Sequence, residues 1–229
     1  QWRYETPGDA TADALRLSAA MTQKAAAAGL ELGGGKCAIC ADGALDPGRR
    51  RELMRDLGDA VEELGGRYIT AEDVGTSAAD MAVVAERTRH VVGLPPESGG
   101  RGDPSPLTAR GVERAIRACL GHRFADPDLA GRRICVIGLG HVGLDLATRL
   151  AAAGADLVAT DIDPARRADA LRIGARWLDP DGAVETECDV LAPCALGGAI
   201  NAANVDALRC AIVCGAANNV LAEDWLAER

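Results

Sequence analysis

The sequence predicts an α/β protein of two domains, and three observations support this prediction. The 229 residues exceed the usual size of a single domain. Hydrophobic residues make up 48% of the chain and charged residues 26%, a balance typical of globular proteins that bury a core. After residue 107, apolar runs alternate with helix-like stretches, and a Gly/Pro-rich segment over 93–106 precedes them. We therefore expect one domain over 1–104 and another over 105–229.

The first domain is expected to be an α/β unit that combines helices with short strands. Three stretches have the composition or apolar spacing of helices and are bounded by glycine or by a capping serine: 10–28, 46–64 and 77–87. Two short apolar runs are predicted to be strands: 36–40 and 67–70.

The second domain is expected to be a doubly wound parallel sheet. It begins with a helix over 107–120. Four apolar runs, separated by stretches that we predict to be helical, have the character of buried strands: 133–137, 156–161, 188–191 and 210–214. Because a helix follows each strand, the strands should run parallel.

The charge balance argues against nucleic acid and membranes as partners. The formal net charge is −9 and the isoelectric point is near 4.9, so the chain would repel phosphate backbones and anionic lipids. No apolar stretch approaches the roughly 18 residues that cross a bilayer, and no secretory leader opens the chain. We expect a cytoplasmic protein.

Several of the eight cysteines lie inside apolar runs and are expected to pack as small hydrophobic residues, among them Cys135, Cys210 and Cys214. Cys37 and Cys40 have the spacing of half a zinc site, but no second Cys/His pair lies nearby to complete four ligands. We therefore predict no metal site.

A glycine motif follows the strand at 133–137. Gly138, Gly140 and Gly143 form G-x-G-x-x-G between an apolar strand and a helix, which is the dinucleotide-binding context of a Rossmann fold. The first glycine permits a tight turn, the second lets the backbone approach a pyrophosphate, and the third permits close packing of helix and strand. His141 and Val142 lie inside this loop and are counted with it as cofactor-binding residues.

Asp161 closes the next strand, where a carboxylate accepts hydrogen bonds from the adenosine ribose. A carboxylate at this position repels a 2′-phosphate, so NAD is the expected cofactor. Arg166 and Arg167 lie nearby and could bind a 2′-phosphate, so NADP stays an alternative cofactor.

Lysine is rare in this chain. Of 25 basic residues only Lys24 and Lys36 are lysines, and they flank one glycine-rich turn at 33–35. Arginine supplies fixed charge but is not deprotonated in proteins, whereas a buried lysine shifts its pKa and acts as a base. We infer that at least one of the two lysines must lose a proton.

These motifs together resemble the Glu/Leu/Phe/Val dehydrogenase family. Seven segments are similar to blocks of that family, in the family's order: 21–24, 26–30, 33–36, 68–76, 102–109, 189–197 and 215–219. The resemblance spans essentially the whole chain and implies NAD-dependent oxidative deamination of an L-amino acid to its 2-oxo acid.

The resemblance also assigns roles to residues of the first domain. It implies that Lys24 holds the substrate carboxylate, that Lys36 is the catalytic lysine and that Asp73 is its acid/base partner. A lysine beside a second cation and shielded from solvent has a lowered pKa, which suits Lys36 to activate water. Considered by itself, Asp73 is also explained as an acidic residue just before the helix that Ser77 caps, because negative charges are favoured near a helix N-terminus.

In the second domain the resemblance implies contacts with both NAD and the amino-acid substrate. Thr108 and Asn218 are implied to contact the nicotinamide end, and the turn at Cys194 and Ala195 its ribose; Asn219 is implied to face the substrate. We expect the cleft between the domains to bring the two sets of residues together.

The substrate is expected to be a branched-chain amino acid, leucine or valine. Ala71 resembles the leucine and valine members, and a small residue there leaves room for an apolar side chain. No lysine remains for a glutamate γ-carboxylate, whereas phenylalanine and tryptophan stay open as alternatives.

Two other functions are weighed against this one. A truncated relative that binds NAD without turnover would not need both lysines and Asp73. An oxidoreductase of 2-hydroxy acids would need a histidine with a carboxylate partner, and none of the three histidines has that setting.

The ends of the chain also differ from the family pattern. The chain begins after the family's Gly-Gly-Thr-Arg segment and ends before its Asn-Ala-Gly-Gly region. We therefore expect a fragment of a homo-oligomeric enzyme, without an N-terminal strand region and part of the substrate pocket.

Overall fold

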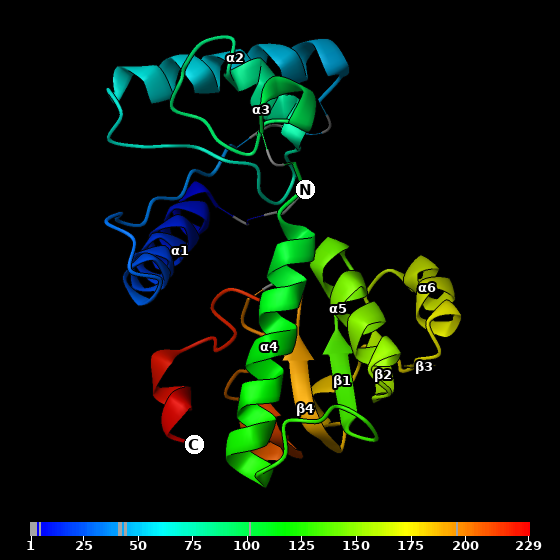
Figure 1. Ribbon diagram of the computed structural model, residues 1–229. Helices are drawn as coiled ribbons and strands as arrows, with labels where there is room; N and C mark the ends of the chain where they lie inside the picture. The colour runs from blue at the N-terminus through cyan, green and yellow to red at the C-terminus, as the bar shows by residue number, and fades with distance from the viewer. Residues whose placement is uncertain (1–3, 5, 41–42, 44, 101, 196) are drawn as a thin grey trace. The chain divides into compact units, whose positions relative to one another are not determined.

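The computed structural model describes residues 4, 6–40, 43, 45–100, 102–195 and 197–229. The chain divides into two compact units, Gln1–Pro104 and Ser105–Arg229 (Figure 1).

The first unit is built on three helices, each of which begins at a polar cap. They are α1 (Pro7–Ala27), α2 (Pro47–Glu63) and α3 (Ala78–Val84). The side chains of Thr6, Asp46 and Ser77 accept hydrogen bonds from backbone N–H groups of the first turns, which would otherwise lack partners. The three predicted helices are thus confirmed, and the third ends at Val84, earlier than predicted.

The two strands predicted in this unit are not formed as such. No described residue of 36–40 takes part in a ladder or bridge, so that prediction is wrong. The run 67–70 contributes one parallel bridge, between Thr70 and Val91. The physical reason is that a strand needs a partner for its backbone hydrogen bonds, and an apolar run alone does not provide one.

A small core joins α2 and α3. Its buried members are Met54, Met81, Val84 and Val91. On the surface of the same pair, Glu86 forms ion pairs with Arg51 and Arg55 of α2.

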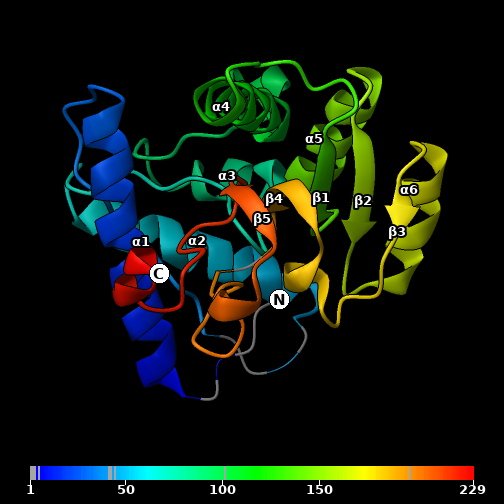
Figure 2. The same cartoon turned by 90° about the horizontal axis from the view of Figure 1, so that it is seen from below.

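The second unit contains a parallel sheet of five strands. The strands are β1 (Arg133–Ile137), β2 (Asp156–Thr160), β3 (Arg176–Trp177), β4 (Cys188–Pro193) and β5 (Cys210–Val213). Their order is β3-β2-β1-β4-β5, which can be followed from right to left in Figure 2. The predicted strands and their parallel pairing are confirmed. The order reverses between β1 and β4, and in such sheets ligands bind beyond the carboxyl ends of the strands at this point.

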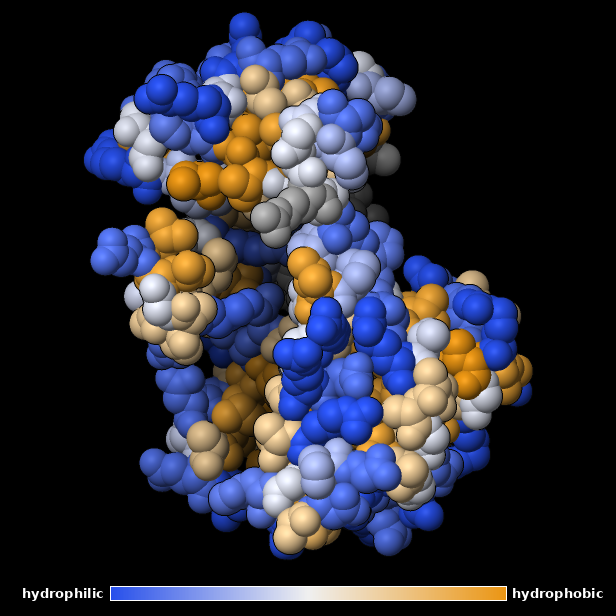
Figure 3. Space-filling view, viewed as in Figure 1, coloured by the Kyte–Doolittle hydropathy of each residue, from blue (hydrophilic) through white to orange (hydrophobic). Residues whose placement is uncertain are grey.

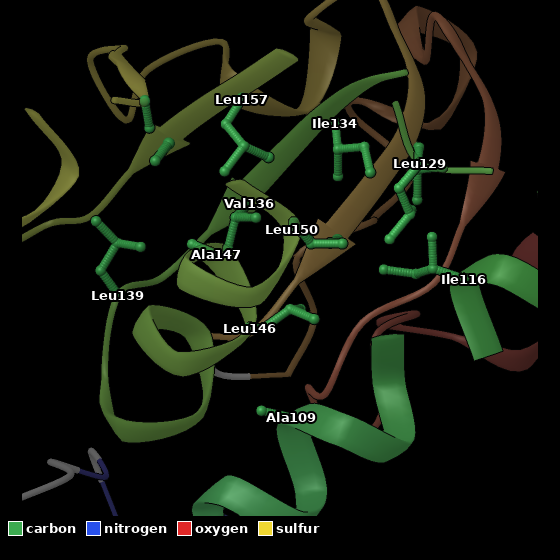
Figure 4. Close-up of a cluster of buried hydrophobic side chains, with 14 of the residues drawn as sticks. Ala109, Ile116, Leu129, Ile134, Val136, Leu139, Leu146, Ala147, Leu150 and Leu157 are labelled. Atoms are coloured by element: carbon green, nitrogen blue, oxygen red, sulfur yellow. The ribbon is translucent and has the colours of Figure 1, made fainter. Parts of the chain in front are cut away.

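Helices α4 (Ser105–Phe124) and α5 (His141–Ala152) cover one face of the sheet. Figure 4 shows side chains of both helices packed on those of β1, among them Ile116, Leu146 and Val136. The side of α4 turned outward in Figure 3 is largely hydrophilic.

The opposite face of the sheet has a smaller core, where Cys135 and Cys188 pack with Val158 and Leu191. Cys135 thus packs as a small hydrophobic residue, as the sequence predicts, and burial raises the pKa of its thiol to about 11. Within the described ranges no helix is long and apolar enough to cross a membrane.

The stretch between β4 and β5 differs from the prediction of a helix. Its described residues include a three-residue 3-10 turn, Val205–Ala207, and an isolated bridge from Ile200 to Leu221, but no α-helix. Asn201 and Asn204 bond nearby backbone groups: Asn204 Oδ1 accepts from the N–H of Asn201, and Asn201 Oδ1 accepts from that of Ala203. Such local side-chain bonds compete with the helical pattern.

Candidate functional site

The glycine turn of the first unit lies directly on α1. The N–H of Gly34 donates to Thr22 Oγ1 at 2.9 Å. A Cβ on Gly34 would lie 1.9 Å from the carbonyl oxygen of Ser18, so only glycine fits here. This contact ties the turn that precedes Lys36 to the helix that carries Lys24.

Gly35 is packed as closely against an aromatic ring. A Cβ at this position would lie 2.7 Å from the ring of Tyr68. Lys36 is the next residue in the sequence, and its Nζ forms an ion pair with a carboxylate oxygen of Asp73. The side chain of Lys36 is 20% exposed and that of Asp73 is 49% exposed. The structure thus brings together two residues that lie 37 positions apart in the sequence and that the resemblance pairs.

The surroundings of Lys36 lower its pKa below the ordinary value of lysine. Burial is the largest cause, and the positive charge of Lys24 lowers the pKa further. The charges of Asp13 and Cys37 act in the opposite direction. The sequence predicted the effect of Lys24 on the pKa of Lys36 but not that of Asp13. Nothing in the spacing along α1 indicates which of its acidic residues approaches the glycine turn at 33–35.

Asp73 opens a tight turn. Its carbonyl accepts from the N–H of Thr76 at 2.8 Å, and its N–H donates to Thr76 Oγ1 at 2.9 Å. Gly75 has a φ of +87°, which is the left-handed conformation that the third position of a type II turn requires. Helix α3 is capped by Ser77, so Asp73 does not serve as its N-cap. Ala71 lies two residues before this turn and is exposed.

In the second unit the three glycines of the fingerprint differ in their surroundings. Gly138 has a φ of +96°, and a Cβ there would lie 2.8 Å from the backbone nitrogen of Ala195. A Cβ on Gly143 would lie 1.9 Å from the carbonyl oxygen of Gly138. By contrast, no described atom lies within 4 Å of the position that a Cβ on Gly140 would take. The backbone at Gly140 is therefore open to a ligand.

The start of α5 lies at this open position. Gly140 is the N-cap and provides no side-chain hydrogen bond, so the N–H groups of the first turn remain available to an anion. His141 begins the helix and is exposed, while Val142 is half-buried.

Asp161 is bound to the glycine loop. Its Oδ2 accepts from the N–H of Leu139 at 2.6 Å, and its Oδ1 accepts from the N–H of Asp163 at 2.8 Å. A carboxylate has about four acceptor positions, so two remain for hydroxyl groups. The loop, the helix start and this carboxylate together fit the pyrophosphate and ribose of a dinucleotide.

The turns after β4 and β5 are joined to each other. The N–H of Gly198 donates to the carbonyl of Asn219 at 2.9 Å, and that of Ala217 donates to Pro193 at 2.9 Å. Asn219 has a φ of +48°, and its Nδ2 is buried without a hydrogen-bond partner in the described part of the chain. Asn218 is exposed.

Two further residues predicted to contact the cofactor lie in the same unit. Cys194 follows the end of β4, where burial raises the pKa of its thiol to about 11, so the thiol is neutral. Thr108 lies in the first turn of α4 and is exposed. The carboxyl ends of β1, β4 and β5 thus carry the glycine loop, the Cys194 turn and the two asparagines.

Known proteins resemble both units. Residues 3–90 match the family model "Glu/Leu/Phe/Val dehydrogenase, dimerisation domain". Residues 108–199 match "D-isomer specific 2-hydroxyacid dehydrogenase, NAD binding domain".

Relatives of the whole chain are amino-acid dehydrogenases. Leucine dehydrogenase of Thermoactinomyces intermedius is 45% identical over 97% of this chain and 61% of its own length. Valine dehydrogenase of Streptomyces virginiae is 44% identical over 96% of this chain and 62% of its own. The chain therefore spans about three fifths of the length of these relatives.

Solved structures agree with this result. L-tryptophan dehydrogenase from Nostoc punctiforme superimposes with a TM-score of 0.72 and 35% identity, over 96% of this chain and 62% of that one. Hetero-hexameric glutamate dehydrogenase from Thermus thermophilus superimposes with a TM-score of 0.75 and 26% identity, over 97% and 59%. On the evidence of these matches, the chain belongs to the Glu/Leu/Phe/Val dehydrogenase family, and its second unit is an NAD-binding domain.

Proposed function

We propose that the protein carrying this chain catalyses the NAD-dependent oxidative deamination of an L-amino acid to its 2-oxo acid and ammonium. The observation that carries the proposal is the ion pair of Lys36 with Asp73, close enough to Lys24 for the charge of Lys24 to lower the pKa of Lys36. The same chain has a dinucleotide-binding loop whose middle glycine, Gly140, is open to a ligand. The names of the leucine and valine dehydrogenase relatives support it.

We assign the binding of NAD to the second unit. When bound, NAD supplies the acceptor for the hydride that leaves the substrate Cα. We assign the pyrophosphate to the loop of Gly138, Gly140 and Gly143 with His141 and Val142, and the adenosine ribose to Asp161. We assign the nicotinamide end to a second group: Thr108, Cys194, Ala195 and Asn218.

The residues of the first unit would move the protons. The ammonium of Lys24 holds the substrate carboxylate by charge. Asp73 takes the proton of the substrate amine, and neutral Lys36 takes a proton from the water that attacks the oxidised carbon. The lowered pKa of Lys36 supports this role, because a base must be neutral near the operating pH.

A branched-chain amino acid is the proposed substrate. The exposed, small Ala71 leaves space for an apolar side chain, and Asn219, whose Nδ2 lacks a partner among the described residues, is the proposed contact from the second unit. An aromatic amino acid is the second candidate, because the chain also resembles an L-tryptophan dehydrogenase.

We further propose a homo-oligomer in the cytoplasm. The family model over 3–90 is named for dimerisation, which supports self-association. All eight cysteines are free thiols, which supports a reducing compartment.

The test is the variant Lys36→Ala in the complete gene product that contains this chain. Removing a general base should lower kcat by about 10²- to 10⁴-fold, while NAD affinity stays nearly unchanged. Reduction of NAD should be assayed with aliphatic, aromatic and acidic L-amino acids. The exposed Arg49 of α2 provides a control, because Arg49→Ala removes a cation whose ion pair in the described part of the chain is with Glu52 of its own helix. A kcat near that of the wild type in Lys36→Ala would refute the proposed mechanism, and NAD binding without turnover of any amino acid would identify a non-catalytic relative.

A further inference from the structure

Arg50 of α2 links two parts of the first unit that are distant in sequence. Its Nε donates to Asp80 Oδ1 at 2.8 Å and its Nη2 donates to Asp80 Oδ2 at 2.8 Å, a two-point contact between guanidinium and carboxylate. The same Nη2 also donates to the carbonyl oxygen of Gly75 at 2.7 Å. One guanidinium therefore joins a carboxylate on α3 to the backbone of a turn.

Asp80 is a fixed anchor for this guanidinium. The residue is only 8% exposed, and its Oδ2 accepts from both the N–H and the hydroxyl of Ser77, at 2.8 Å and 2.7 Å. The guanidinium of Arg50 holds the pKa of Asp80 below its ordinary value, so the carboxylate stays charged at neutral pH. Arg50 is thus held by a charged group that is itself held at the start of α3.

Gly75 belongs to the turn that begins at Asp73. The Asp73 carboxylate is half-exposed, accepts from the N–H of Val74 at 2.8 Å and contacts Lys36. Thr76 Oγ1 accepts from the N–H of Asp73, the first residue of the turn, and the guanidinium of Arg50 donates to the carbonyl of Gly75, the third. A carboxylate that is not enclosed by packing depends on its backbone for its position.

We propose that Arg50 is a positioning residue, which fixes the turn from Asp73 to Thr76 so that the Asp73 carboxylate meets Lys36. The proposal rests on the proposed function, in which Asp73 and Lys36 act on the substrate. Arg50 does not contact the reacting groups; it acts through the carbonyl of Gly75.

An ordinary structural ion pair between α2 and α3 is the competing explanation. Arg51 provides the matched comparison, because it also extends from α2 and pairs with Glu86 just after α3. Among the residues that the structure describes, its guanidinium forms no hydrogen bond or ion pair with the turn. If Arg50 only joined the helices, losing Arg50 and losing Arg51 would have the same effect on activity.

The experiment compares Arg50→Ala, Arg50→Lys and Arg51→Ala in the complete gene product, with the preferred amino acid and NAD. Arg50→Ala should lower kcat by about 10- to 100-fold, since small displacements of reacting groups have effects of this size. The KM for NAD should stay unchanged. Arg50→Lys should also lose activity, because one ammonium does not reproduce the planar fork that reaches both Asp80 and Gly75. Arg51→Ala should keep the wild-type kcat.

A chemical rescue separates positioning from folding. Guanidinium chloride at sub-denaturing concentration should restore part of the kcat of Arg50→Ala, while sodium chloride at the same ionic strength should not. Failure of the rescue in a folded variant, or equal kcat in Arg50→Ala and Arg51→Ala, would overturn the inference. If Arg50→Ala does not fold, a wild-type kcat in Arg50→Lys overturns it.

One more variant distinguishes this inference from the proposed function. Asp73→Asn should abolish most of the activity. If Asp73→Asn is inactive and Arg50→Ala is normal, only the role of Arg50 is refuted. If Asp73→Asn is as active as the wild type, the role of Asp73 in the proposed function fails and the inference fails with it.

Discussion

Two glycine-rich loops, one in each unit, use glycine in different ways. In the turn at 33–35, Gly34 and Gly35 are packed against α1 and the ring of Tyr68, whereas no described atom lies within 4 Å of a Cβ on Gly33. In the loop at 138–143, the first and last glycines are packed against protein atoms and only the middle one is open. The packed glycines shape the protein, and an open glycine is available to a ligand or to solvent.

The loops also differ in what they position. The turn of the first unit positions a side chain, Lys36, relative to the cation of Lys24. The loop of the second unit positions backbone N–H groups at the start of α5. A substitution at a packed glycine of the first loop should therefore affect catalysis, and one at the open position of the second loop should affect cofactor binding. Four predictions test this difference.

Gly34→Ala should have the largest effect. The added Cβ would meet the carbonyl oxygen of Ser18 at 1.9 Å and the nitrogen of Thr22 at 2.5 Å, both of which are backbone atoms that cannot move alone. The turn must shift, so kcat should fall by about 10²-fold and the free energy of unfolding by ~1–3 kcal/mol. Steady-state kinetics and denaturant titration measure the two effects. NAD affinity should not change, and a variant that loses NAD binding as well would contradict the separation of the loops.

Gly140→Ala should weaken NAD binding without harming the fold. The residue has a φ of −67°, which alanine adopts readily, and its Cβ would meet no described atom within 4 Å. The methyl group would occupy space that a pyrophosphate needs, so we expect the Kd for NAD to rise about tenfold, or ~1.4 kcal/mol. Calorimetry measures this change. The melting temperature should move little, because alanine for glycine at an N-cap costs at most about 1 kcal/mol; a large drop would mean that this glycine also serves packing.

Lys24→Ala should change the pH dependence of the reaction. Lys36 acts as a base in its neutral form, so kcat should rise with pH through the pKa of Lys36, and the lowered pKa places that rise below the ordinary pKa of lysine. Because the charge of Lys24 lowers the pKa of Lys36, its removal should move the rise to higher pH. The measurement is kcat against pH at saturating substrate. Gln23→Ala, an uncharged neighbour on α1, should leave the profile in place, and a shift to lower pH in Lys24→Ala would refute the coupling.

Gly33→Ala should have the smallest effect and serves as the control for Gly34→Ala. Gly33 is exposed and its Cβ would have no described neighbour within 4 Å. The free energy of unfolding should change by no more than about 0.5 kcal/mol. In a steady-state assay, kcat should stay within a factor of two of the wild type, which corresponds to ~0.4 kcal/mol of activation free energy. A loss as large as that of Gly34→Ala would show that the whole turn, and not its packed residues, is sensitive.

Much of the fold was predictable from local patterns. Helices α1 and α2 begin and end within a few residues of the predicted positions, because capping residues and glycines act on the backbone next to them. Strands β1, β2 and β4 were predictable because each contains a continuous apolar run that is buried on both faces. Strand β5 lies at the edge of the sheet and was predictable from its apolar composition, although Ile212 is its only buried residue. The glycine fingerprint was recognisable for the same reason, since its strand, loop and helix follow one another directly.

Other features depend on partners that are remote in sequence. The run at 36–40 has the composition of a strand but no pairing partner among the described residues. The stretch between β4 and β5 fails for a different, local reason, because bonds made by Asn201 and Asn204 replace the predicted helix. The roles of the site residues remain predictions, although the contact of Lys36 with Asp73 is a feature of the structure.

The sequence by itself determined where chemistry is possible: the two lysines, the acidic residue that follows Thr70 and the G-x-G-x-x-G loop. Only the tertiary structure decided which glycines are packed and which are open, that Asp13 acts on Lys36, and that Arg50 reaches Gly75. The physical reason is that residue type and spacing report on neighbours within one helix or strand, whereas these contacts join different helices, turns and strands, and only the packing of the whole unit sets their distances. Asp13 and Lys36 are 23 positions apart in the sequence, and Arg50 and Gly75 are 25.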